Sequence, residues 1–123
     1  ASRGILNSIK NGRMVALLSD QDAGRAGIEV TMFDKKVMTP GGTAAFAIKT
    51  GAPIIIGVIL RNDDIYTHSL LTEKLIMPEL TGDKKEDIAN ITQAYTDKVA
   101  KLIENYPELW FWPHRRFKRV VDY

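Results

Sequence analysis

The feature that most constrains the fold of this sequence is a long segment in which apolar side chains recur at helical spacing. These side chains are Ile88, Ile91, Tyr95, Val99, Leu102, Ile103 and Tyr106. Intervals of three and four residues place them on one face of an α-helix. Asp83, with Glu86 three residues later, matches a capping box at a helix start. Residues 83–106 therefore predict an amphipathic helix, about 36 Å long.

Shorter elements of both types precede this helix. Continuous or alternating apolar runs predict strands at residues 14–19, 28–33 and 53–61, and a less regular one within 65–77. Helical spacing predicts further helices at residues 4–11 and 43–50. A helix between two buried strands suggests a crossover unit. The predicted fold class is therefore α/β, with a mixed central sheet flanked by helices.

Composition limits the domain organisation and the classes of function. The 123 residues are expected to form a single α/β domain, residues 1–123. The net charge of +2 makes the whole surface a poor match for a polyanion, so an electrostatic role requires local clustering, and no nucleic-acid partner is expected. The absence of cysteine excludes disulfides, thiolate metal sites and cysteine nucleophiles. We expect no metal and no cofactor, and no apolar run reaches membrane-spanning length.

A polar, glycine-rich loop, SDQDAGRAG, follows the expected strand at 14–19. Functional loops of open α/β sheets cluster at the carboxyl ends of strands. Asp20 and Asp22 could orient a base, bind a metal or hold basic residues, or they could simply complete a turn. The glycine spacing matches neither a dinucleotide-binding fingerprint nor a P-loop.

Aromatic and basic residues are concentrated near the C-terminus. Trp110, Phe111 and Trp112 are followed by a cluster of cationic or ionisable side chains, namely His114, Arg115, Arg116, Lys118 and Arg119. In one interpretation the aromatic rings fill the core and the basic groups are solvated. In another, the rings anchor the segment while the guanidinium groups face phosphate. The two interpretations are compatible.

His68 and Glu73 form an H-x4-E pattern, which can place a catalytic base beside a carboxylate. The surrounding residues predict a strand, however, and side chains five residues apart on a strand point to opposite faces. We therefore do not assign these residues as a catalytic pair. Serine and histidine are also too sparse to suggest a complete nucleophilic triad.

Three stretches together closely resemble the C-terminal portion of the late acyltransferases of lipid A biosynthesis. They are GRMVALLSDQDAGRAGIEVTMFD, MTPGGTAAFAIKTGAPIIIGVILR and YPELWFWPHRRFK, in that order. These proteins are the lauroyl/myristoyl acyltransferase family of Gram-negative bacteria, within the glycerolipid acyltransferase superfamily. The DQD loop and the P-E-x-W-x-W-x-H-R-R-F-K ending are the diagnostic parts.

The resemblance implies the C-terminal part of a larger acyltransferase. Such an enzyme transfers a fatty acyl chain from acyl carrier protein to a hydroxyl of a Kdo-lipid A precursor, at the cytoplasmic face of the bacterial inner membrane. The catalytic H-x4-D/E motif of the family lies upstream of the DQD loop. We therefore expect no catalytic residue in this chain, which should be soluble and inactive alone.

By the same resemblance, eight residues are candidates for substrate binding, and they lie in the DQD loop and the basic ending: Asp20, Gln21, Asp22, Arg25, His114, Arg115, Arg116 and Lys118. The expected partners are acyl carrier protein, a lipid A precursor and the inner-membrane surface. The alternative is a non-catalytic binding module for phosphorylated lipid, acidic protein or nucleic acid.

Overall fold

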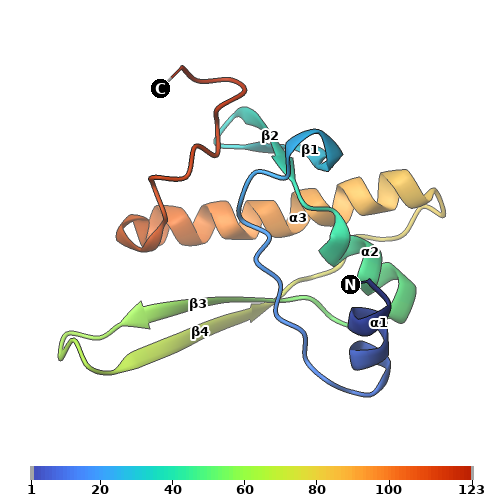
Figure 1. The fold of residues 1–123 in the computed structure, drawn as a ribbon, viewed down its shortest axis with the longest axis horizontal. Coiled ribbons are helices and arrows are strands. Elements are labelled where there is room, and N and C mark those ends of the chain that lie inside the picture. The colour runs from blue at the N-terminus through green and yellow to red at the C-terminus, as the bar shows by residue number, and fades with distance from the viewer. Residues whose placement is uncertain (1, 123) are drawn as a thin grey trace.

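The computed structural model describes residues 2–122, which form three α-helices and two β-hairpins (Figure 1). The helices are α1 (Ser2–Lys10), α2 (Gly42–Thr50) and α3 (Lys84–Asn105). The strands are β1 (Ile28–Met32), β2 (Lys35–Thr39), β3 (Ile55–Arg61) and β4 (His68–Lys74). Single 3₁₀ turns occur at Gly24–Ala26 and Pro107–Leu109. In Figure 1, α3 crosses the molecule between the two hairpins.

The predicted long helix is confirmed as α3, and so is the signal at its start. The side chain of Asp83 accepts hydrogen bonds from the backbone N–H groups of Lys85 and Glu86, at 2.8 and 2.9 Å. These bonds satisfy two of the amides that the first turn of a helix leaves unpaired. The helix ends at Asn105, shortly before Pro107, which cannot continue it.

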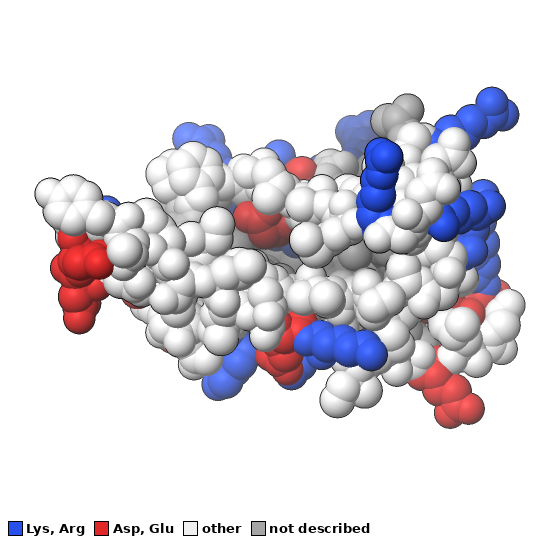
Figure 2. Space-filling view, turned by 90° about the horizontal axis from the view of Figure 1, so that it is seen from below, with Lys and Arg blue, Asp and Glu red and all other residues white. Residues whose placement is uncertain are grey.

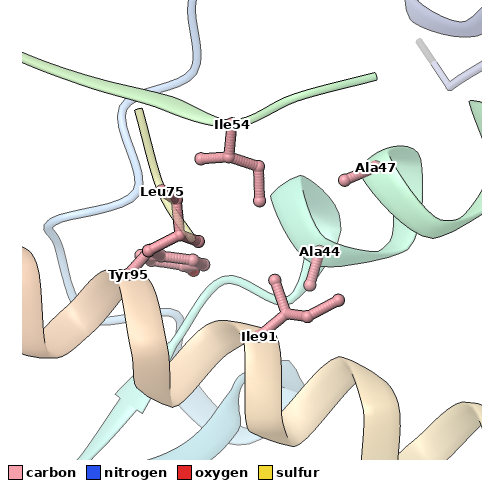
Figure 3. Packing of buried hydrophobic residues seen from close by; sticks show 6 residues of the cluster. All are labelled: Ala44, Ala47, Ile54, Leu75, Ile91 and Tyr95. Carbon is pink, nitrogen blue, oxygen red and sulfur yellow. The ribbon is translucent and has the colours of Figure 1, made fainter. Parts of the chain in front are cut away.

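One face of α3 supplies side chains to two hydrophobic clusters. The first cluster joins α2, α3 and the residues that flank the β3–β4 hairpin, and Figure 3 shows its members, Ala44, Ala47, Ile54, Leu75, Ile91 and Tyr95. The second joins α3 to the β1–β2 hairpin through Val30, Met32, Val37 and Ile103. The predicted apolar face therefore holds both hairpins on a single helix.

The predicted mixed central sheet is wrong. The described strands form two separate antiparallel pairs, in which Ile28 lies opposite Thr39 and Ile55 lies opposite Lys74. Helix α2 connects β2 to β3, which belong to different sheets, so it is not a crossover. The order of elements along the chain does not determine which strands pair.

The strand predicted at residues 14–19 is also wrong. Residues 13–19 form no regular element, and Met14 and Leu18 are 92% and 88% exposed. A continuous apolar run has the composition of a buried strand, but a strand also needs a hydrogen-bonded neighbour, and none of the described strands pairs with this segment.

The strands predicted at 28–33 and 53–61 are confirmed as β1 and β3, and β4 occupies the middle of 65–77. The sequence pattern does not predict strand β2, because its first two residues, Lys35 and Lys36, interrupt any apolar pattern. It forms through a two-residue turn in which Phe33 and Asp34 both have positive φ, of 50° and 58°. Such turns match the twist of an antiparallel hairpin.

Candidate functional site

An apolar groove of about 470 Å³ lies between the β3 strand, the second half of α3 and residues 17–20. Its apolar lining includes Ile56, Val58, Val99 and Leu102. Figure 2 shows the molecule from below, the side on which the β3–β4 hairpin and α1 lie in Figure 1. Most of the surface seen there carries no charged side chain. The volume falls in the range of ordinary small-molecule sites, so the groove can hold an extended apolar ligand.

Polar side chains gather at one part of the groove lining. They come from Ser19, Asp20 and Thr43, and the hydroxyl groups of Ser19 and Thr43 are hydrogen-bonded at 2.8 Å. Thr43 lies in the first turn of α2. We call this part of the lining, Ser19, Asp20 and Thr43, the groove mouth.

Tyr95 lines the same groove from α3 and is largely buried. Its hydroxyl donates a hydrogen bond to the carbonyl of Pro40 at 2.5 Å. Burial raises the pKa of the Tyr95 phenol to about 12, because the charged phenolate is poorly solvated there. The phenol therefore stays protonated near neutral pH and serves as a structural hydrogen-bond donor, not as a base.

The loop after the groove mouth is tied to the C-terminal segment through Asp22. The Asp22 carboxylate is only 2% exposed, and Oδ2 lies 2.8 Å from Nζ of Lys118. Nε of Arg119 lies 3.6 Å from Oδ1. Burial alone raises the pKa of Asp22, but the hydrogen bond and charge of Lys118, the N–H of Gly24 and the charge of Arg119 outweigh it. The net effect is a lowered pKa.

The C-terminal segment is held down by packing and by a buried guanidinium. Trp110 and Phe117 pack against the second hydrophobic cluster, whereas Phe111 and Trp112 are exposed. Arg116 is 2% exposed, and its Nη1 and Nη2 donate to the carbonyl of Met38 and the hydroxyl of Thr39. Burial lowers the pKa of Arg116 from its ordinary value, and the nearby charge of Asp22 opposes that effect.

The structure brings together five of the eight predicted substrate-binding residues, from segments about 90 residues apart. They are Asp20, Asp22, His114, Arg116 and Lys118. The other three, Gln21, Arg25 and Arg115, have exposed side chains nearby in the chain. Substrate binding by these eight residues stays a prediction.

His68 and Glu73 both lie in β4, where they pair with Arg61 and Ile56 of β3. Five strand steps separate them by about 17 Å, which is too far for a direct hydrogen bond. Glu73 is instead paired with Lys98 of α3. The strand predicted around this H-x4-E pattern is thus confirmed, and the absence of a catalytic pair there stays a prediction.

The described residues hold neither a metal cluster nor a membrane-spanning helix. Among residues 2–122, no group of three or more His, Cys, Asp or Glu side chains is arranged to hold a metal ion. In the same part of the chain, no helix combines the length and the hydropathy that crossing a bilayer requires.

The DQD loop and the basic ending can be recognised in the sequence, whereas the groove cannot. Apolar periodicity does not distinguish a core face from a groove wall, so the apolar lining of the groove carries no sequence signal of its own. Ser19 and Thr43 carried a usable signal, since Ser19 directly precedes Asp20 and Thr43 follows two glycines at a helix start.

Comparison with known proteins gives these features a family. The family model for bacterial lipid A biosynthesis acyltransferases matches residues 1–119. The chain is 34% identical over 119 residues to the lipid A biosynthesis palmitoleoyltransferase of Escherichia coli strain K12, and 32% identical to the lauroyltransferase of the same strain. Each alignment covers 94% of this chain and 37% of the relative.

A more distant relative is named for a different acceptor. The chain is 30% identical over 106 residues to a phosphatidylinositol mannoside acyltransferase of Mycobacterium tuberculosis, covering 83% of this chain and 30% of that protein. The chain therefore spans only 30–37% of the length of these relatives. By its sequence match and its order of motifs, it belongs to the bacterial lipid A biosynthesis acyltransferase family.

Proposed function

We propose that this chain is part of an enzyme that transfers a fatty acyl chain to a hydroxyl group of a lipid acceptor. The family match over residues 1–119 carries the proposal. The apolar groove beside the DQD loop supports it, because an acyl chain needs an apolar site of this kind. The relatives named above share acyl transfer, in lipid A biosynthesis or on a phosphatidylinositol mannoside.

We further propose the substrates of the reaction and the place where it occurs. The donor is acyl carrier protein, the acceptor is a Kdo-lipid A precursor, and the reaction occurs at the cytoplasmic face of the bacterial inner membrane. A general base removes the proton of the acceptor hydroxyl while the oxygen of that hydroxyl attacks the thioester carbonyl carbon. The carbon–sulfur bond then breaks, and the carrier thiolate leaves and takes up a proton.

We assign the base to no residue of this chain. The Tyr95 phenol stays protonated, and His68 lies on the exposed β3–β4 hairpin without its carboxylate partner. The contribution proposed for this chain is instead the binding of the acyl chain in the groove. Each methylene that leaves water there contributes about 0.8 kcal/mol to binding.

The eight predicted substrate-binding residues take two different parts in this proposal. Asp20, Gln21, Arg25 and Arg115 have enough surface exposure to meet the polar parts of the donor or acceptor. Cationic groups such as Arg25 and Arg115 suit phosphate or an acidic carrier by charge complementarity. The other four residues contact one another or β2, and they hold the loop in place without direct contact with the substrate. They are Asp22, His114, Arg116 and Lys118.

A chimera tests the proposal. Residues 1–119 would replace the matching region of the Escherichia coli palmitoleoyltransferase, and acyl transfer from acyl carrier protein to a lipid A precursor would be measured. Transfer above the level of a chimera that carries Val58→Trp in the groove supports the proposal. A folded chimera with no transfer contradicts it.

The isolated chain provides a second, independent test. We expect no acyl transfer from the 123-residue chain alone. Transfer by the isolated chain that disappears in His68→Ala would overturn the assignment of no base and restore the H-x4-E pair of β4 as catalytic.

A further inference from the structure

We infer that four C-terminal residues form a clasp that holds the loop of residues 19–24 in place. They are His114, Arg116, Lys118 and Arg119. This loop contributes Ser19 and Asp20 to the groove mouth. The segment that contains the clasp runs upward past β2 in Figure 1, after the chain leaves α3. The cationic groups of the clasp contact other residues of this chain, namely Asp22 and Met38. This role therefore differs from the binding of an external anion.

The first contact of the clasp is to the backbone of the loop. The N–H of Asp22 donates to Nε2 of His114 at 2.9 Å, so Nε2 carries no proton in this arrangement. The N–H of Gly24 donates in turn to Oδ2 of Asp22, at 3.2 Å. The imidazole of His114 therefore fixes the peptide at one end of a turn that the Asp22 carboxylate closes.

The second contact is between charges. Lys118 reaches Oδ2 of Asp22 and Arg119 approaches Oδ1, and the carboxylate between them is almost completely buried. A buried carboxylate that lost these cations would retain its desolvation cost without compensation. The loop is therefore stable in this position only while the C-terminal segment stays in place.

The third contact joins the loop, the clasp and a strand at one atom. The carbonyl oxygen of Met38 accepts from the N–H of Ala23 at 3.0 Å and from Nη1 of Arg116 at 2.6 Å. Because Met38 belongs to β2, and Val37 of β2 is buried in the second hydrophobic cluster with Ile103 of α3, this point is anchored to the packed part of the fold.

The loop held in this way forms part of the groove. Ser19 and Asp20 line the groove, and Asp20 is only two residues from Asp22. We therefore regard His114 and Lys118 as positioning residues, which act on a bound ligand through the loop. The consequence for an acyl ligand rests on the proposed function, whereas the clasp itself can be tested without a ligand.

Amide hydrogen exchange of the ¹⁵N-labelled 123-residue chain tests the clasp. In Lys118→Met we expect exchange at Asp22, Ala23 and Gly24 to accelerate at least about tenfold, because local opening becomes easier. Lys118→Arg keeps the positive charge and should restore slow exchange. The amides of Thr31 and Thr81, which are bonded to Gln93 and Asp87, serve as internal references that should not change.

Lys98→Met is the matched control, because Lys98 is also a partly exposed ion-pair partner, of Glu73 in β4. It should leave exchange in the loop unchanged. His114→Gln and His114→Leu form a second pair of variants. The glutamine side-chain oxygen can still accept a hydrogen bond from the Asp22 N–H, whereas leucine has no acceptor. Unchanged exchange at Asp22–Gly24 in Lys118→Met and His114→Leu, or equal acceleration at Thr31 and Thr81, would overturn the clasp.

The effect on the groove is measured with laurate, by titration of the methyl resonances of Ile56 and Val58. We expect Lys118→Met to weaken laurate binding at least about threefold, with recovery in Lys118→Arg. If loop exchange accelerates but laurate binding is unchanged, the positioning role is wrong. If the wild-type chain does not bind laurate, the acyl role of the groove fails, and the exchange data alone decide for or against the clasp.

Discussion

The backbone N–H of Asp22 donates a hydrogen bond of 2.9 Å to Nε2 of His114, although the two residues are 92 positions apart in the chain. Lys118 and Arg119 reach the carboxylate of the same aspartate. The two most distinctive motifs of the sequence, the DQD loop and the basic ending, are thus the two halves of one structural unit.

The Asp22 carboxylate should make stability depend on pH. Its pKa is lowered in the folded protein, so it stabilises the fold fully above its ordinary pKa, near 3.8, and less as pH falls through the folded value. At neutral pH we expect Asp22→Asn to lower the free energy of unfolding by about 2 kcal/mol. Urea titrations should show this difference shrinking below about pH 3.8. Asp63→Asn, in an exposed turn, is the control, and a difference that persists at low pH would contradict the account.

Ile91 should be among the most sensitive positions of the core. It is fully buried between α2 and the residues that flank the β3–β4 hairpin, as Figure 3 shows. Ile91→Ala removes apolar contacts and leaves a cavity, so we expect a loss of about 2–5 kcal/mol in unfolding free energy. Ile76→Ala, at an exposed position, should change stability little. Equal losses in the two variants, measured by urea denaturation, would show that the packing is described wrongly.

Gly27 should not tolerate even a methyl group. A Cβ at this position would lie 2.9 Å from Cβ of Ala23 and 3.0 Å from Cβ of Met38, close to where the loop meets β2. We expect Gly27→Ala to cost about 1–3 kcal/mol by overpacking. In Gly4→Ala the new methyl has open space within a helix, which should stabilise the chain by up to about 1 kcal/mol. Thermal unfolding of both variants measures the contrast, and a neutral Gly27→Ala would be inconsistent with it.

Filling the groove should block the binding of an apolar ligand. Val58 lines the groove from β3, so Val58→Trp is expected to weaken laurate binding by more than about tenfold, through loss of space. Leu70→Trp places the same ring on β4, at a position that is 67% exposed and does not line the groove. Calorimetric titration of both variants provides the comparison. Laurate binding that is insensitive to Val58→Trp would place the ligand elsewhere.

Local sequence determined the elements whose signals lie within a few neighbouring residues. The repeat from Ile88 to Tyr106 and the Asp83 cap specify α3, because both depend on contacts within one or two helical turns. The glycine at position 51, with φ of 71°, ends α2 for a similarly local reason. The family, too, could be identified from short motifs whose order along the chain is enough.

The tertiary structure decided which segments meet. Met14 and Leu18 belong to an apolar run, yet they are exposed because that run pairs with none of the described strands. The charged Lys35 and Lys36 lie in a strand, because they pair with β1. The sequence presents Arg116 as one more member of a basic cluster, yet the fold buries it against β2. Such outcomes depend on which surfaces are available for packing after the chain has folded back on itself. They involve residues dozens of positions apart, so no local pattern in the sequence contains them.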